Sequence, residues 1–185
     1  MSRPAKKSPA KKLSAKETYP QALYPYWRYE YAKKILKKGT SADPFFNVEK
    51  FDDKEHLIVA RGAWSCMLLN ASPYAPGHML VVPYRQVSQL EDLTPEESEE
   101  LMDLVVAGKL LLQKELKADG INIGINQGNM DVSGGSVPSH LHWQIVPRWK
   151  ADNNFMPVIA GTRLLITSQE NVWKILSKAY KKLKA

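Results

Sequence analysis

The feature of this chain that most restricts its fold is a run of alternating polar and apolar residues at 137–149, Val-Pro-Ser-His-Leu-His-Trp-Gln-Ile-Val-Pro-Arg-Trp. Such alternation is typical of a β-strand, because successive side chains of a strand point to opposite faces. The pattern predicts that His140, His142 and Gln144 share one face, opposite Leu141, Trp143 and Ile145. Neighbours on the polar face would lie about 6.5–7 Å apart along the strand. That spacing suits imidazole and amide groups lying along a phosphate chain.

The same alternation also has a plainer interpretation. A half-exposed edge strand can carry two histidines without any functional role, and alternation of histidines is by itself a weak motif. Half of the four histidines of the chain fall within three residues of this run. Other parts of the sequence must therefore decide between a polar ridge and a binding site.

Length and composition indicate one domain with extensions. The chain has 185 residues, of which 44% are hydrophobic, so it can bury a sizeable core. Its one cysteine, Cys66, lies in an apolar run and is expected to be a buried structural thiol. No apolar run approaches the roughly 20 residues that cross a bilayer, and the basic N-terminus lacks the apolar stretch of a secretory signal. We therefore expect a cytoplasmic protein that is not associated with a membrane.

The positive charge is concentrated at the N-terminus. The net charge is +7, and residues 1–20 contain six basic residues and one acidic residue, a net charge of +5 that leaves +2 for the rest. This composition predicts a disordered basic tail at 1–20 and a single domain at 21–185. The tail could contact nucleic acid loosely through phosphates. Its lack of interleaved aromatic residues and the nearly neutral body disfavour specific nucleic-acid binding.

Two helices and four further strands can be placed. Thr94-Pro95-Glu96-Glu97 is a capping box with proline at the first helical position, and it predicts a helix that runs to about Lys117. Its apolar side is formed by Leu101, Leu104, Val105, Leu111 and Leu112. A last amphipathic helix is expected around 169–183, with a buried stripe of Val172, Leu176, Ala179 and Leu183. Strands are predicted at 57–60, 64–69, 78–83 and 121–126, the last with its isoleucines facing the core.

A glycine-containing loop at 127–135 precedes the alternating run and ends in Gly134-Gly135-Ser136. Glycines allow a ligand to approach the backbone closely and leave N–H groups free for an anion. Two adjacent glycines could equally form a plain hairpin turn. The histidines that follow directly favour anion binding.

Taken together, these blocks resemble the histidine triad (HIT) superfamily of nucleotide-binding proteins over roughly residues 23–180. The matching blocks are Asn70, Pro-Gly-His-Met-Leu-Val-Val-Pro at 76–83, Leu-Thr-Pro-Glu-Glu at 93–97 and His-Leu-His-Trp-Gln-Ile-Val-Pro-Arg at 140–148. The chain looks most similar to a bacterial branch related to diadenosine tetraphosphate phosphorylases, through residues 26–28, 122–128, 146–149 and 152–156. The resemblance implies an α+β fold: an antiparallel five-stranded sheet with a long helix and a C-terminal helix. It also implies a homodimer.

By this resemblance, His142 would be the nucleophile that attacks the α-phosphorus of an adenosine polyphosphate and becomes adenylylated. His140 would order the site, and Asn70 would bind the ribose near an apolar base pocket that includes Leu68. Residues at phosphate-contacting positions would be Asn126, Gly135 and Ser136, with His78 supporting the phosphate site. Although His78 matches this position, a histidine beside a Pro-Gly turn is commonly a structural hydrogen-bonding group. The expected partners are an adenosine nucleotide or dinucleoside polyphosphate and inorganic phosphate, and the scheme requires no cofactor.

The chain departs from the family pattern at two positions. Gln144 occupies the third triad position, where many members carry histidine, and glutamine cannot deliver a proton to a leaving group. This resembles the transferring members of the superfamily and favours phosphorolysis over hydrolysis. Hydrolysis and non-catalytic nucleotide binding remain the alternatives. Asp43-Pro-Phe-Phe46 stands where many bacterial relatives have Cys-x-x-Cys binding zinc, so we expect no metal.

Overall fold

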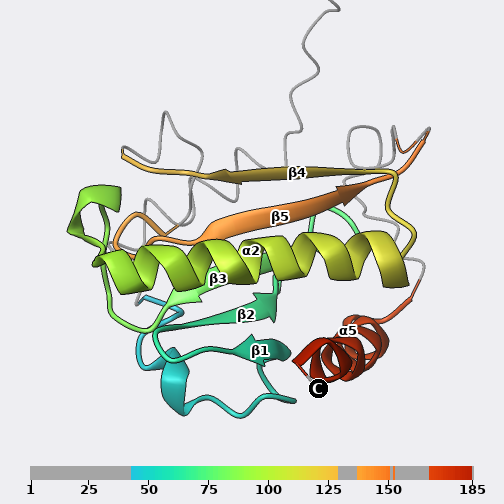
Figure 1. The fold of residues 1–185 in the computed structure, drawn as a ribbon, viewed down its shortest axis with the longest axis horizontal. Coiled ribbons are helices and arrows are strands. Elements are labelled where there is room, and N and C mark those ends of the chain that lie inside the picture. Colours follow the sequence, from blue (N-terminus) through green and yellow to red (C-terminus); the bar gives the residue numbers. More distant parts are fainter. Residues whose placement is uncertain (1–42, 129–136, 151, 153–166, 185) are drawn as a thin grey trace, which may run out of the picture.

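The computed structural model describes residues 43–128, 137–150, 152 and 167–184 (Figure 1). Their centre is a five-stranded antiparallel sheet with the order β1-β2-β3-β5-β4. The strands are β1 (Ile58–Arg61), β2 (Ser65–Leu69), β3 (Met79–Pro83), β4 (Gly120–Ile125) and β5 (Trp143–Arg148). Short 3-10 helices, η1 (Val48–Lys50) and η2 (Leu90–Asp92), lie in the connections. The predicted α+β fold with an antiparallel five-stranded sheet is confirmed.

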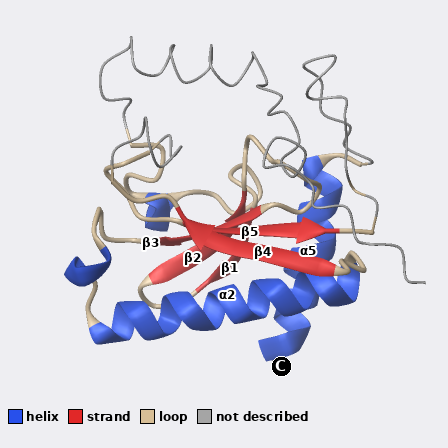
Figure 2. Ribbon diagram, turned by 90° about the horizontal axis from the view of Figure 1, so that it is seen from above, coloured by secondary structure: helices blue, strands red, loops and turns tan. Residues whose placement is uncertain are grey.

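The long helix α2 (Pro95–Glu115) begins at the predicted capping box. Thr94 Oγ1 accepts a hydrogen bond from the Glu97 backbone N–H, and the Glu97 carboxylate accepts one from the Thr94 N–H. The five apolar residues predicted for its inner side are all buried. Gly108 lets the helix lie close to the sheet, because a Cβ at this position would come within 2.8 Å of both Ile145 Cδ1 and Met67 Sδ. Figure 2 shows α2 lying along one face of the sheet.

The last helix, α5 (Gln169–Lys184), packs against β1 and α2. Val172, Leu176 and Ala179 are buried as predicted. The prediction for Leu183 is wrong, because its side chain is 50% exposed and Tyr180 is buried in its place. Ala179 and Tyr180 follow Leu176 by three and four residues, so both lie on the same side of the helix as Leu176.

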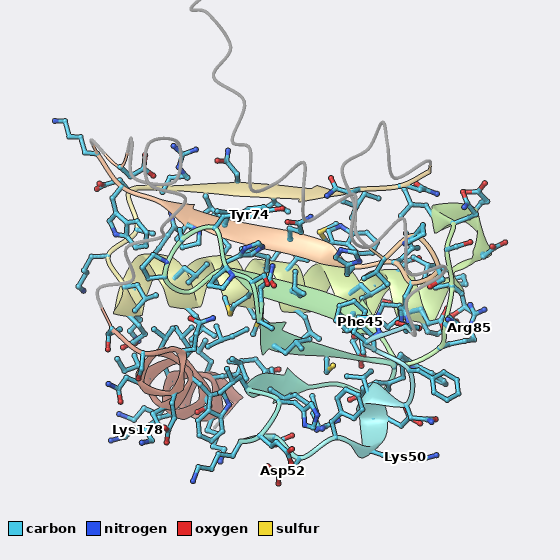
Figure 3. The ribbon with its side chains drawn as sticks, turned by 180° about the vertical axis from the view of Figure 1, so that it is seen from behind. Phe45, Lys50, Asp52, Tyr74, Arg85 and Lys178 are labelled. Atoms are coloured by element: carbon cyan, nitrogen blue, oxygen red, sulfur yellow. The ribbon has the colours of Figure 1, made fainter. Side chains whose placement is uncertain are left out.

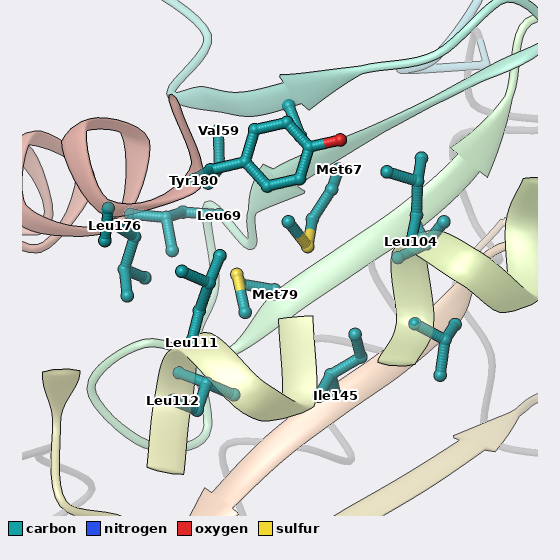
Figure 4. Packing of buried hydrophobic residues seen from close by; sticks show 14 of the residues in the cluster. Val59, Met67, Leu69, Met79, Leu104, Leu111, Leu112, Ile145, Leu176 and Tyr180 are labelled. Carbon is teal, nitrogen blue, oxygen red and sulfur yellow. The ribbon is translucent and has the colours of Figure 1, made fainter. Parts of the chain in front are cut away.

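The core is divided between the two faces of the sheet. On the face under α2 and α5, Met67, Met79 and Ile145 contribute to a large apolar cluster (Figure 4). On the opposite face, Leu68 and Leu80 join a smaller cluster with Phe45, Val48, Ile58, Cys66 and Val82. Burial raises the pKa of the Cys66 thiol to about 12, as fits the predicted structural role of this residue.

Strand β4 has fewer buried side chains than its sequence suggests. Among the described strands it pairs only with β5, so it lies at the edge of the sheet. Ile123 is 46% exposed, and Ile121 and Ile125 are half-buried. The prediction that these isoleucines face the core is correct for the side they occupy, and Ile121 packs against the main core cluster, but Ile123 on the edge strand remains exposed.

Candidate active site

The register of the strands determines which residues share the face opposite α2. Leu68 pairs with Leu80, Leu80 pairs with Gln144, and Gln144 pairs with Gly124. Residues directly opposite each other in antiparallel strands point to the same face. Gln144 therefore projects from the face that carries Leu68, whereas Ile145 points toward α2 and is fully buried. Figure 3 views this face, with Phe45 and Tyr74 over the strands.

His140 and His142 lie just before β5, so the prediction that one strand covers the whole run is wrong at its start. Pro138 and Ser139 are in a turn, and β5 begins only at Trp143. The segment between the histidines is fixed by a backbone hydrogen bond of 2.7 Å, in which Leu141 N–H donates to the Val87 carbonyl.

The His142 ring is nearly buried and held by one of its nitrogens. Its Nδ1 lies 2.9 Å from the His140 carbonyl oxygen, which can only accept, so Nδ1 carries the proton. Burial lowers the pKa of His142 below that of a free imidazole; the nearby His140 also lowers it, while the bond to the carbonyl and the charge of Asp43 oppose the shift. The ring is therefore neutral near pH 7, with an unprotonated Nε2 that can act as a nucleophile.

The His140 ring is buried and bonded at both nitrogens. Its Nδ1 lies 2.7 Å from Asp43 Oδ2, and its Nε2 lies 2.9 Å from the Pro83 carbonyl oxygen. Phe45 contacts both histidines, with its ring centroid 5.6 Å from that of His140 and 5.5 Å from that of His142. Sequence reasoning identified neither Asp43 nor Phe45 as site residues. The only signal was that this segment stands where related proteins have a metal-binding motif.

His78 and Asn70 organise the loop between β2 and β3. His78 is fully buried, and its Nδ1 accepts a hydrogen bond of 3.1 Å from the Tyr74 backbone N–H. The Asn70 amide nitrogen lies 3.3 Å from the same Nδ1, and its Oδ1 accepts from the Ser72 N–H at 2.8 Å. Gly77 makes the turn into β3 with a positive φ of 81°. This network matches the structural interpretation of His78, while the ring remains on the face that carries Gln144.

A hollow of about 270 Å³ lies over β4 and β5 and brings two predicted residues, Asn126 and Gln144, together. The remaining residues that line it are Tyr74, Asn122, Ile123, Gly124, Ile125 and Val146. Amide groups line one side, so the hollow offers hydrogen-bond donors to a polar ligand. A second hollow of about 470 Å³, beside Arg85 and Ser139, contains none of the predicted residues. Gly135 and Ser136 lie outside the described residues.

Two general properties of the described residues bear on function. No cluster of three or more histidine, cysteine, aspartate or glutamate side chains within them could hold a metal ion. None of the described helices combines the length and the apolar character needed to span a membrane.

The sequence comparisons place the chain in a family. The profile of the HIT domain matches residues 53–151, which is more than half of the chain. The chain belongs to the HIT family. The matched region contains His140, His142, Gln144 and the loop between β2 and β3.

Members of the HIT family with curated names are similar to this chain. A Mycobacterium tuberculosis protein named AP-4-A phosphorylase is 44% identical over 124 residues, which cover 67% of this chain and 63% of that protein. A Schizosaccharomyces pombe bis(5'-nucleosyl)-tetraphosphatase is 41% identical over 51% of this chain and 50% of its own length. A Saccharomyces cerevisiae bis(5'-adenosyl)-triphosphatase is 38% identical over 52% of this chain and 46% of its own length. The chain thus covers less than two thirds of each relative.

Solved structures share the HIT fold. A hypothetical histidine triad nucleotide-binding protein from Sulfolobus tokodaii has a TM-score of 0.57 at 26% identity, over 69% of this chain and 85% of that chain. A uridylyltransferase has a TM-score of 0.62 at 18% identity, over 85% of this chain and 51% of that chain. The second similarity shows the fold alone.

Proposed function

We propose that the protein transfers an adenylyl group from a dinucleoside polyphosphate to inorganic phosphate, with His142 as the nucleophile. The observation that supports this most directly is the bond from His142 Nδ1 to the His140 carbonyl, which leaves Nε2 unprotonated. The 44% identity to a protein named AP-4-A phosphorylase favours the same class of substrate. A covalent intermediate divides one difficult displacement into two easier ones.

The two steps balance for diadenosine tetraphosphate. The Nε2 lone pair of His142 forms a bond to the α-phosphorus, the bond from that phosphorus to the bridging oxygen breaks, and ATP leaves. An oxygen of hydrogen phosphate then attacks the same phosphorus, and its proton passes to solvent. The phosphorus–nitrogen bond breaks, ADP leaves, and the neutral imidazole is restored.

The remaining site residues would hold the substrate. Gln144 and Asn126, which line the same hollow, would donate amide hydrogen bonds to phosphoryl oxygens where negative charge builds up. Asn70 would bind the ribose hydroxyls, and Leu68 would contact the base. Gly135 and Ser136 are proposed as further phosphate contacts, and His78 as the support of the adjacent loop.

Gln144 favours transfer over hydrolysis. A glutamine amide can donate a hydrogen bond but has no proton to transfer, so it cannot act as the general acid or base that a third histidine would supply. Phosphate, which is a better nucleophile than water near pH 7, needs less help from a base. The yeast relatives named tetraphosphatase and triphosphatase support hydrolysis as the second candidate.

The decisive experiment is a product analysis with diadenosine tetraphosphate in the presence and absence of inorganic phosphate. Phosphorolysis yields ADP and ATP only when phosphate is added. Equal rates of AMP and ATP formation with and without phosphate would show a hydrolase. Tight binding of AMP with no turnover and no adenylylated protein after an acid quench would show a non-catalytic nucleotide-binding protein.

We also propose that the protein is a homodimer that pairs through α2 and β4. Met102, Val106 and Leu110 form an exposed apolar stripe on α2, each about half exposed. The stripe lies on the solvent side of α2, away from Gly108, which faces the sheet. Ile123 on the edge strand β4 is exposed as well, and exposed apolar side chains on a helix and an edge strand are of the kind that an association partner covers. Light scattering should show a dimer that Val106→Glu with Ile123→Glu converts to a monomer, whereas Ile175→Glu on α5 leaves it intact.

A further inference from the structure

The Asp43 carboxylate is the centre of a hydrogen-bond cluster that joins three distant parts of the chain. Its Oδ1 accepts from the Phe45 backbone N–H at 2.9 Å. Its Oδ2 accepts from the Gln86 amide nitrogen at 2.8 Å and from His140 Nδ1 at 2.7 Å. The carboxylate accepts from the Phe45 N–H and the Gln86 amide, and in its ionised form it also accepts from His140 Nδ1.

The His140 ring is placed where its charged form would balance this carboxylate. One of its nitrogens faces Asp43, the other faces the Pro83 carbonyl oxygen at 2.9 Å, and both of these groups only accept hydrogen bonds. With Asp43 ionised, both bonds require both ring nitrogens to be protonated. The ring is fully buried and the Asp43 side chain is 6% exposed, so each charge lies away from water and depends on the other.

We infer that Asp43 is a positioning residue: it holds His140 as a doubly protonated imidazolium and, through the His140 carbonyl, keeps His142 in the tautomer with Nε2 unprotonated. This inference rests on the proposed function in so far as it concerns catalysis. It gives this chain a way to order the site with a hydrogen-bonded carboxylate at the position where related sequences carry a metal-binding cysteine.

The geometry explains why one carboxylate can affect the nucleophile. The His140 ring and the His140 carbonyl belong to one residue, so a ring fixed at both ends also fixes the carbonyl that accepts from His142 Nδ1. Asp43 additionally bonds the backbone of Phe45, whose ring contacts both imidazoles. The titratable groups that face His140 in the described structure are Asp43 and His142. A site ordered in this way avoids rearrangement when the substrate binds.

The first test is nitrogen NMR on the full chain labelled with ¹⁵N at histidine. The chain has four histidines, and His140→Gln and His142→Ala assign the two relevant rings. We expect His140 to have two protonated ring nitrogens, and His142 to have a protonated Nδ1 only, near neutral pH. In Asp43→Asn, which keeps the size of the side chain, His140 should lose one ring proton and His142 should become a mixture of tautomers. A wild-type His140 with a single ring proton would overturn the inference.

The second test separates positioning from stability. Asp43→Asn should lower kcat by about 10- to 100-fold while KM changes by no more than about threefold, because only the orientation of the nucleophile is lost. Asp53→Asn is the matched control, since it removes the charge of a carboxylate that also accepts from a cation at 2.7 Å, in that case from Arg61. An unchanged kcat in folded Asp43→Asn contradicts the inference. If wild-type protein forms no adenylyl-histidine, the proposed function fails, and the NMR spectra still decide whether Asp43 sets the two histidines.

Discussion

On β5, Ile145 lies fully buried beneath α2, whereas its neighbour Gln144 lines a hollow on the opposite face. The same contrast continues across the sheet. Under the helices the strands contribute mostly apolar side chains, packed around Gly108, with Ser65 as a polar exception that bonds Glu100 of α2. On the other face, buried histidines and Asp43 lie beside apolar residues, and no buried side-chain nitrogen or oxygen of the described residues lacks a hydrogen-bond partner. One face thus provides stability through packing, and the other maintains polar groups in defined positions.

His142→Ala is expected to have the largest effect on function. Loss of the nucleophile should lower turnover of diadenosine tetraphosphate by at least about 1000-fold and abolish the adenylylated protein. The melting temperature should change little, because within the described part of the chain the ring makes a single hydrogen bond. Mass spectrometry after an acid quench measures the adduct. His56→Ala is the control, since that ring stacks on Phe51 outside the site and its loss should leave the adduct in place.

Valine introduced at two glycines tests the comparison between the faces directly. Gly108→Val places a side chain against Ile145, Met67 and Met79, so we expect a loss of about 1–3 kcal/mol in the free energy of unfolding with an unchanged KM. No described atom lies within 4 Å of a Cβ at Gly124, and valine suits a strand. Gly124→Val should therefore keep its stability within about 0.5 kcal/mol and raise KM roughly tenfold by filling the hollow.

Denaturant unfolding measures the stability of both valine variants, and steady-state kinetics measure their KM. A loss of stability in Gly124→Val, or a raised KM in Gly108→Val, would show that the two faces do not divide packing and binding between them.

Glu100→Gln should have a smaller effect, limited to stability. The Glu100 carboxylate on α2 accepts from the Ala63 N–H, the Trp64 N–H and the Ser65 hydroxyl, and so fixes the turn between β1 and β2. A glutamine would turn its own NH₂ group toward one of these donors, at a cost of about 1–2 kcal/mol. Like Asp43 it receives three hydrogen bonds, but no histidine is among its partners. Thermal unfolding should report the loss while kcat remains within about twofold of wild type.

The start of α2 and its buried side could be predicted from the sequence in detail, because the signals for both are local. The capping box at Thr94 and the spacing of the apolar residues in α2 depend on residues close together in the chain, and both are confirmed. The burial of β4 could not be predicted in the same way. Alternation identifies the side on which Ile123 lies, but whether another element covers it depends on the length and placement of α2.

The polar face could be predicted only in part. His142 and Gln144 were identified from the alternating run and Asn126 from the family pattern, and the structure brings Gln144 and Asn126 to one hollow. Asp43 lies 97 residues before His140, and no pattern of spacing connects two residues so far apart. The sequence has Asp43 where the family resemblance predicts a metal-binding cysteine. Only the fold shows that the Asp43 carboxylate bonds His140.

The smallest expected effect is on the pH dependence, and it concerns the ring of His142. Because its pKa is lowered mainly by burial, the folded protein binds fewer protons at this residue than the unfolded chain does at pH values just below about 6.5. Stability should therefore decrease as the pH falls from about 6.5 through the lowered pKa, and the slope should be smaller in His142→Gln. Activity should fall over the same acid range, since a protonated Nε2 has no lone pair for phosphorus, so the acid limb of kcat/KM should lie below about pH 6.5. An acid limb above about pH 7 would mean that the His142 ring is stabilised in its charged form. His142 could then not serve as the neutral nucleophile.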